Sequence, residues 1–250
     1  MHRLVITCAV VGIVFSALGI VVRLLYRKAE NRMAELLLSI ALFGIMWQVF
    51  VHLLILTRQI VDFPNLYNKG IPLYYLVAPA FYYFVRIKLR QEQRLPRYWY
   101  LHLLPFFFGV IDVLPYVFLD YSEKVAFLER LVFDTRLGYQ HAYGFIPQHT
   151  HYILRLSLAV CYLIAQWAML FTTDSTDSSV RPTTLRAKYL LTALYTLFIA
   201  FQIGMFFNIV FNRTQAGYIL TDFDQLVWLS VLYVLLSCWI CFQPLFQRTK

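Results

Sequence analysis

The sequence predicts an all-α polytopic membrane protein, a bundle of seven transmembrane helices with the N-terminus outside and the C-terminus in the cytoplasm. Of the 250 residues, 60% are hydrophobic and only 14% are charged, whereas soluble domains have about 45–50% apolar and about 25% charged residues. The apolar residues gather in blocks about 20 residues long, the length that a helix needs to cross a hydrocarbon core of about 30 Å. Most charged residues lie between these blocks.

Seven such blocks follow one another along residues 1–250 and predict a single transmembrane domain. The first block is too long for the core of a signal peptide, and most of its flanking positive charges follow it, so we expect a retained span. The expected spans are Leu4–Leu25, Ala34–Leu56, Ile71–Val85, Tyr98–Leu119, His151–Phe171, Tyr189–Phe211 and Gln225–Phe242.

Prolines mark the third and fourth blocks. Pro72 suits the first turn of a helix, whereas Pro79 is expected to kink the third span. Pro105 and Pro115 lie inside the fourth block and free backbone carbonyls there. In a membrane, neighbouring helices have to satisfy such carbonyls.

The basic residues between the blocks predict the orientation, because Lys and Arg are retained on the cytoplasmic side of a membrane. Fourteen of the 22 Lys and Arg residues fall on one side of the predicted bundle, and seven fall on the other side over longer segments. The larger set is therefore expected to be cytoplasmic. It comprises Arg23, Arg27, Lys28, Arg32, Arg86, Lys88, Arg90, Arg94, Arg97, Arg181, Arg186, Lys188, Arg248 and Lys250.

Residues 120–150 form the longest segment on the outer side. Connections of more than about 15 residues usually have a function or contain further structure. Ser122–Phe133 is expected to form a short amphipathic helix on the outer surface. His149 and His151 have a spacing that can chelate a metal, but no acidic or cysteine partner lies near them in sequence, so we predict no metal site.

The sequence lacks the motifs of common enzyme classes. It contains no HExxH, no GxSxG, no glycine-rich phosphate loop and no paired carboxylates within a span. We therefore expect no catalytic residue and no cofactor. The four cysteines lie in apolar blocks, which favours buried apolar packing over a disulfide framework.

Two charged residues lie within predicted spans, where charge is costly. Asp112 lies about two turns from the outer end of the fourth block, and Arg155 lies about one turn into the fifth, so their depths are similar. One interpretation is an ion pair that locks the two spans together, and the other is a role in ligand binding. Arg155 can also extend its side chain outward to the interface alone.

Further polar side chains lie from mid-membrane to the outer ends of the second, sixth and seventh blocks. A cavity that opens outward would gather them on its walls, although hydrogen bonds between helices explain them equally well. The candidate ligand-binding set is His52, Asp112, Arg155, Gln202, Asn208 and Gln225.

Four short runs resemble segments of one bacterial family. Gly70–Tyr75 together with Ala78–Tyr83 resembles the third span of that family, His102–Phe106 resembles the entry to its fourth span, and Phe242–Phe246 resembles the exit from its seventh. The family is the membrane-bound transcriptional regulators of AraC type, in which a seven-helix sensor precedes a cytoplasmic helix-turn-helix domain. The resemblance implies a multi-pass protein of the bacterial cytoplasmic membrane, with homodimeric output.

No helix-turn-helix pattern occurs within the 250 residues. The chain is therefore expected to be either the sensor part of a longer regulator or a relative without the output domain. In either case DNA would be reached only through a downstream domain.

We expect a signal-receiving domain that detects a small extracytoplasmic or membrane-borne ligand and relays it through the seventh span. A small-molecule transporter is the first alternative, and an enzyme that acts on lipid within the membrane is the second.

Overall fold

The computed structural model describes residues 2–26, 32–92, 94–141, 143–176, 182–211 and 222–246. Every regular element in this part of the chain is a helix. The α-helices are α1 (His2–Tyr26), α2 (Arg32–Leu56), α3 (Ile71–Arg90), α4 (Leu104–Phe118), α5 (Tyr121–Leu131), α6 (Leu137–Gln140), α7 (Gln148–Thr176), α8 (Pro182–Phe211) and α9 (Asp222–Phe246), and the short 3-10 helices are η2 (Gln59–Val61), η3 (Pro64–Leu66) and η4 (Trp99–Leu103).

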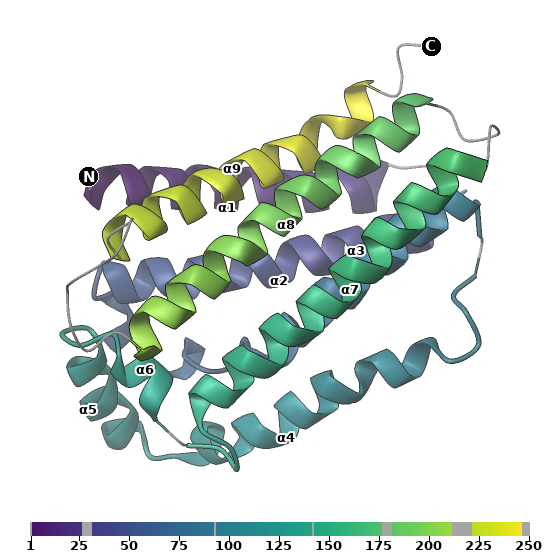
Figure 1. The fold of residues 1–250 in the computed structure, drawn as a ribbon. Coiled ribbons are helices and arrows are strands. Elements are labelled where there is room, and N and C mark those ends of the chain that lie inside the picture. The colour runs from purple at the N-terminus through teal and green to yellow at the C-terminus, as the bar shows by residue number, and fades with distance from the viewer. Residues whose placement is uncertain are drawn as a thin grey trace.

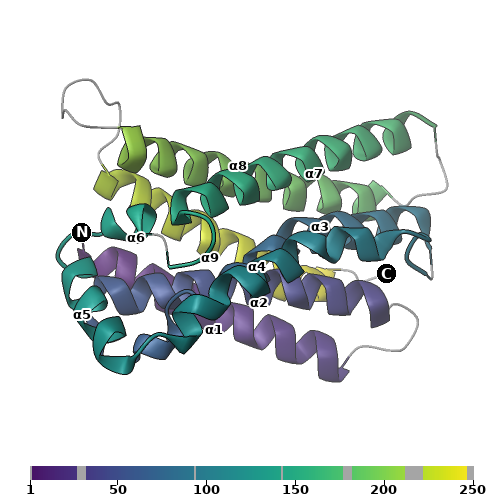
Figure 2. The same cartoon turned by 90° about the horizontal axis from the view of Figure 1, so that it is seen from below.

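The long helices α1, α2, α3, α4, α7, α8 and α9 lie side by side in a bundle, and each runs in the opposite direction to the one before it (Figures 1 and 2). The two short helices α5 and α6 lie together at one end of the bundle, the end at which α1 starts. We call residues 121–140, which contain α5 and α6, the cap. The bundle therefore has a cap end and an opposite end, and α9 finishes at the opposite end.

Five segments of the described chain are long and apolar enough to cross a membrane: Arg3–Leu25, Arg32–Leu56, Trp99–Phe118, Gln148–Thr173 and Leu185–Asn208. The apolar stretch of α9, Leu226–Phe242, is shorter, and α3 has Lys88 and Arg90 in its last turn. Large apolar side chains such as Val14, Leu18, Phe107 and Ile111 are about half exposed on the surface of the bundle. An all-helical fold with apolar helices of spanning length and an apolar surface is that of an α-helical membrane protein.

Each predicted block lies largely within one long helix, but several boundaries differ. Helices α7 and α9 extend beyond their blocks at both ends, and α8 starts at Pro182 instead of Tyr189. The third predicted block ended at Val85, whereas α3 continues to Arg90, since basic residues extend a helix as readily as apolar ones. The fourth block begins with η4, and α4 starts only at Leu104. Pro105 therefore lies in the first turn of α4, where a missing N–H removes no hydrogen bond. The expectation that Pro105 frees a carbonyl inside a helix was wrong.

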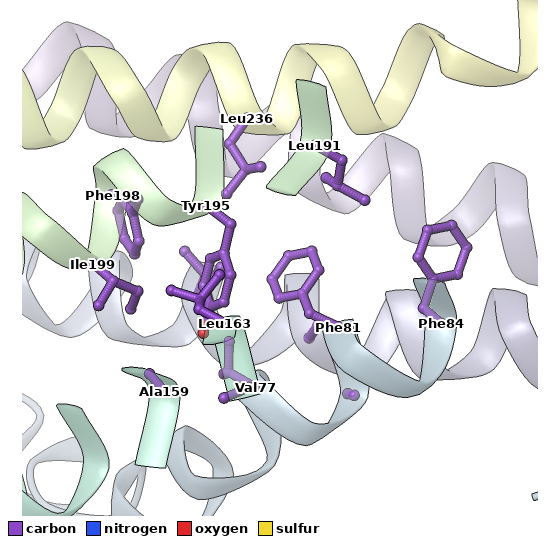
Figure 3. Packing of buried hydrophobic residues seen from close by; sticks show 14 of the residues in the cluster. Val77, Phe81, Phe84, Ala159, Leu163, Leu191, Tyr195, Phe198, Ile199 and Leu236 are labelled. Atoms are coloured by element: carbon purple, nitrogen blue, oxygen red, sulfur yellow. The ribbon is translucent and has the colours of Figure 1, made fainter. Parts of the chain in front are cut away.

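The main core lies between α2, α3, α7, α8 and α9. Figure 3 shows side chains of α3, α7, α8 and α9 pointing toward one another in its centre. The Phe81 ring of α3 packs on the Tyr195 ring of α8 with 4.4 Å between the ring centroids. Both side chains are buried, as are Phe198 and Leu236. Aromatic packing of this kind holds α3 near the centre of the bundle, where it contacts α2, α4 and α7.

The cap has a separate apolar core with the cap-end parts of α2 and α4. Helix α5 buries Lys124, Phe127, Leu128 and Leu131, a spacing that places all four on one helix face. The amphipathic helix predicted at residues 122–133 is thus confirmed, with Tyr121–Leu131 as its bounds. The Lys124 ammonium donates to the Val117 carbonyl at 2.8 Å, so it satisfies the last turn of α4 and fixes the cap to the bundle.

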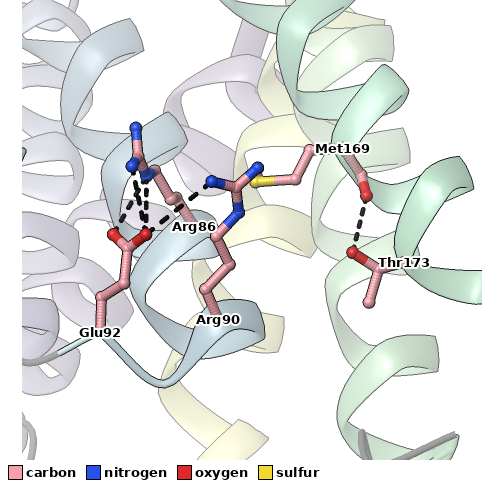
Figure 4. Close-up of polar contacts among 5 residues, drawn as sticks. All are labelled: Arg86, Arg90, Glu92, Met169 and Thr173. Atoms are coloured by element: carbon pink, nitrogen blue, oxygen red, sulfur yellow. Dashed lines mark hydrogen bonds and ion pairs between the residues drawn. The ribbon is translucent and has the colours of Figure 1, made fainter. Parts of the chain in front are cut away.

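At the opposite end, Glu92 folds back on the end of α3 (Figure 4). Its carboxylate accepts hydrogen bonds from Arg86 Nε at 3.0 Å and Arg86 Nη2 at 3.1 Å. Arg90 lies 3.9 Å from the same carboxylate. Gln91 turns the chain with a left-handed φ of 54°.

Candidate functional site

Asp112 is the centre of a buried polar network near the cap end. One of its carboxylate oxygens, Oδ2, accepts from His151 Nε2 at 2.7 Å. The other, Oδ1, accepts the backbone N–H groups of Phe145 at 2.7 Å and Ile146 at 3.1 Å. The predicted ion pair between Asp112 and Arg155 is therefore wrong. His151 lies one helical turn before Arg155 on α7 and takes the position opposite Asp112.

The chain after the cap passes very close to Asp112. A Cβ atom added to Gly144 would come within 2.0 Å of Asp112 Oδ2, so only glycine allows the backbone to approach the carboxylate. This approach brings the N–H groups of the next two residues into hydrogen-bond range. The network thus ties the segment between the cap and α7 to α4.

The network continues from His151 to Tyr75 on α3. The distance between His151 Nδ1 and the Tyr75 hydroxyl is 2.9 Å. When Nε2 donates to Asp112, Nδ1 of a neutral imidazole accepts from the tyrosine hydroxyl. All three residues are at most 4% exposed, so a phenol, an imidazole and a carboxylate form a buried chain of hydrogen bonds.

Arg155 lies on the same face of α7 but has other neighbours. Its guanidinium lies over the rings of Tyr152, with 4.6 Å to the centroid, and Tyr74, with 5.1 Å. Its Nη2 donates to Gln202 Oε1 on α8 over a long 3.4 Å. Within the described residues, no carboxylate lies within ion-pair distance of Arg155.

Of four cavities that described residues line, the largest lies beneath the cap and has a volume of about 160 Å³. We call it the cap cavity. The cap forms its roof, and α2, α3, α7, α8 and α9 form its walls. Each element contributes at least one side chain, for example Val51, Tyr74, Tyr139, Tyr152, Met205 and Leu226.

A second cavity of about 80 Å³ adjoins the first between α1, α2, α8 and α9. His52 and Leu226 line both cavities, and Gln202 lines the second. Two smaller spaces of about 20 and 10 Å³ lie beside Arg155. The smaller of these two spaces shares Ile71, Tyr74, Gln148 and Tyr152 with the cap cavity. Arg155 lines both small spaces but not the cap cavity, and it therefore lies next to the cap cavity.

The six candidate residues therefore separate into three groups. His52, Arg155 and Gln202 each line at least one of the four cavities. Asp112 and Asn208 are buried, at 4% and 6% exposure, but line none of these four cavities. The side chain of Gln225, in the first turn of α9, lies outside the described residues.

Sequence reasoning missed the tyrosines of the site and the role of His151. Tyr74 and Tyr152 supply ring faces to Arg155, and Tyr75 ends the Asp112 network. The sequence did contain a signal for this site. His151, Tyr152 and Arg155 lie within about one turn of α7, so their side chains can reach the same region of the bundle. His151 was weighed only as a metal ligand with His149. The described residues include no group of three His, Cys, Asp or Glu side chains placed to hold a metal ion.

Comparison with known proteins finds no match to this chain: no protein-family model, no curated protein and no solved structure is similar to it.

Proposed function

We propose that this chain is the signal-receiving domain of a bacterial membrane-bound regulator of AraC type. In this account a small ligand enters from outside, occupies the cap cavity and shifts α9, which leads to a cytoplasmic output. The cavity beneath the cap carries the proposal, because α9 forms part of its wall through Leu226. A ligand in the cavity would therefore contact the helix that leads toward the output.

Near its opposite end, α9 is joined to α1 by a buried hydrogen bond. Pro244 lies within α9 and has no N–H, so the carbonyl of Ile240, four residues earlier, loses its helical hydrogen bond. Arg23 of α1 donates to this carbonyl instead. Any sliding or rotation of α9 would have to break or carry along this contact.

Arg23 also belongs to a buried ion-pair cluster. Its Nη1 lies 2.5 Å from Glu35 of α2, and Lys88 of α3 lies 3.0 Å from the same carboxylate. Four helices therefore meet at this cluster, with the freed carbonyl of α9 as one member. Two arrangements of such a cluster would give the switch between signalling states that a relay needs.

The proposal places all seven long helices in the membrane with the cap outside. Helix α3 has 20 residues and α9 has 25, lengths of about 30 Å or more at 1.5 Å per residue. Their alternating directions put the basic ends of α1 and α3 on the side of the last turn of α9. The excess of Lys and Arg on that side supports a cytoplasmic location.

A cavity-filling substitution tests the proposal without knowledge of the ligand. A dimeric DNA-binding reporter domain is fused after Lys250, and Leu226→Trp is introduced to occupy the cap cavity. We expect the reporter domain to stay in one signalling state, either active or inactive, while the protein still inserts into the membrane. Leu235→Trp is the matched control, because Leu235 lies on the same helix, is 50% exposed and lines none of the four cavities.

Equal reporter output from wild type and Leu226→Trp would contradict the proposal. If the purified chain then carried labelled solutes into proteoliposomes and Leu226→Trp blocked the uptake, the cavity would belong to a transporter.

A further inference from the structure

The chemistry around Arg155 indicates what the cap cavity binds. A guanidinium has five N–H donors, and the described residues offer Arg155 one acceptor, the Gln202 oxygen at 3.4 Å. The guanidinium also lies over the rings of Tyr74 and Tyr152, which stabilise the cation without using its N–H groups. Its contacts thus come from α3, α7 and α8, and most of its N–H donors have no acceptor among the described residues.

The nearby acid is not a substitute partner. Asp112 already accepts three hydrogen bonds, one from His151 and two from backbone N–H groups. No carboxylate from the described residues lines any of the four cavities, and Arg155 is the one charged residue among their described lining residues. The four adjoining cavities therefore have a single positive charge in their walls, on the Arg155 side.

The cap cavity adjoining Arg155 is mostly apolar. Val51, Ile55, Ile71 and Met205 contribute aliphatic or thioether surface to it. Its volume of about 160 Å³ is close to that of a cavity of about 150 Å³ that takes up one benzene molecule. The space thus suits a compact apolar body of about that size.

We infer that the cap cavity binds a small carboxylic acid in its ionised form, with the carboxylate at the Arg155 guanidinium and a compact apolar body beneath the cap. The planar fork of arginine matches the two oxygens of a carboxylate. A lipid head group offers the same anionic chemistry, but the volume favours a small acid. This inference rests on the function proposed above, since it names the class of the ligand.

Benzoate and benzamide are the probes, because they have nearly the same shape and differ in charge. The full chain is purified into nanodiscs of phosphatidylcholine, and each compound is titrated at low salt by calorimetry. We expect benzoate to bind at least tenfold more tightly than benzamide. Arg155→Gln should weaken benzoate about ten- to a hundredfold, the range for hydrogen bonds to charged groups, and leave benzamide unchanged.

Two variants keep this test decisive. Arg155→Lys retains the charge and should fold, but it lacks the planar fork, so its affinity for benzoate should lie between those of wild type and Arg155→Gln. Arg136→Gln removes an exposed arginine beside α6 that lines none of the cavities. It should bind benzoate as wild type does.

Equal affinities for benzoate and benzamide, or an Arg155→Gln variant that binds benzoate normally, would overturn the inference. The lipid source is tested by adding phosphatidylglycerol to the nanodiscs. Competition with benzoate that disappears in Arg155→Gln would assign the site to a lipid anion and overturn the small acid.

The experiments distinguish an error in the proposed ligand class from an error in the proposed sensor function. If benzoate does not bind while Leu226→Trp still locks the reporter, the carboxylate is wrong and the sensor stands. If benzoate binds through Arg155 but neither benzoate nor Leu226→Trp changes the reporter, the site is correct and the sensor function is wrong.

Discussion

At the scale of single residues, the polar groups near the cap end divide into one closed network and one open cation. Asp112 has three hydrogen-bond partners, and His151 connects it to Tyr75. Arg155, one turn along α7, is held mainly by ring faces. The closed network suits a structural role, because every buried polar partner is satisfied. The open cation suits a ligand.

A double-mutant cycle distinguishes the two roles. Asp112→Asn removes the charge that holds His151, and a hydrogen bond to a charged group is worth about 1.5–3 kcal/mol. Asp112→Asn and His151→Gln should therefore destabilise the protein non-additively in detergent, whereas Asp112→Asn and Arg155→Gln should act additively. Unfolding curves for the single and double variants measure both couplings. A large coupling between Asp112 and Arg155 would contradict the geometry.

His141, which follows α6, predicts a pH dependence of the cap. Its Nε2 lies 2.9 Å from the Tyr67 hydroxyl, and its Nδ1 is buried without a partner within the described part of the chain. Burial, and to a smaller extent the nearby His151, lowers the pKa of His141 to about 4. The unfolded chain has a histidine pKa near 6.5 and binds the proton first, so the stability of the cap should fall as the pH drops from about 6.5 to about 4.

Amide hydrogen exchange in the cap across this pH range, corrected for the intrinsic exchange rate, measures the effect. His141→Gln keeps a hydrogen-bonding group for Tyr67 but cannot titrate, so the loss of protection at low pH should be smaller in this variant. Equal pH dependence in the variant and wild type would assign the effect to another group.

At the scale of elements, the two ends of α9 differ in their contacts. Near the cap end, Leu226 faces the two larger cavities. Near the opposite end, Arg23 holds the Ile240 carbonyl that Pro244 leaves open. One end of α9 thus lies beside the cavities, and the other end is bound to a buried ion-pair cluster. A ligand that fills the cavities and displaces α9 would therefore strain this cluster.

A rescue experiment tests this account of α9. Arg23→Gln should destabilise the protein by about 3–5 kcal/mol, because it takes one cation away from buried Glu35 and weakens the contact with Ile240. Pro244→Ala in that background restores an N–H to the helix and should recover part of the loss. Chemical unfolding in detergent measures both steps. A Pro244→Ala change that is equally stabilising with Arg23 present would show that the two residues act independently.

The elements were largely predictable from sequence, and the site was not. Apolar blocks of spanning length located every long helix, since block length is a local property. The short amphipathic helix expected at Ser122–Phe133 corresponds to α5, whose buried Phe127, Leu128 and Leu131 share one helix face. The pairing of Asp112 with His151 depends on helix rotation and on the close approach of Gly144. Neither is encoded in depth along a span, the property from which the Asp112–Arg155 pair was predicted.

At the scale of the whole molecule, the cap and the basic ends of α1 and α3 lie at opposite ends of the bundle. The cap covers the cap cavity. The last turns of α1 and α3 place Arg23, Lys88 and Arg90 at the other end of the bundle. If the cap is outside, the cavity faces the medium and α9 leaves toward the cytoplasm.

Reporter fusions test this orientation. A reporter that is active only in the cytoplasm should be active after Lys250, and one that is active only outside should be active when inserted near Tyr139 in the cap. Both fusions should be inactive when the two reporters are exchanged. The reverse pattern would contradict the orientation inferred from the basic residues.

We propose above that a ligand in the cap cavity moves the opposite end of α9, and a distance measurement tests this movement directly. Spin labels at Met33, an exposed residue at the start of α2, and at Phe242, an exposed residue near the end of α9, report the distance between these helices. Pulsed electron paramagnetic resonance of the full chain in nanodiscs, with and without benzoate, should show a shift of about 1–2 Å or more. The shift should vanish in Arg155→Gln. An unchanged distance distribution at benzoate concentrations that saturate calorimetric binding would contradict the claim.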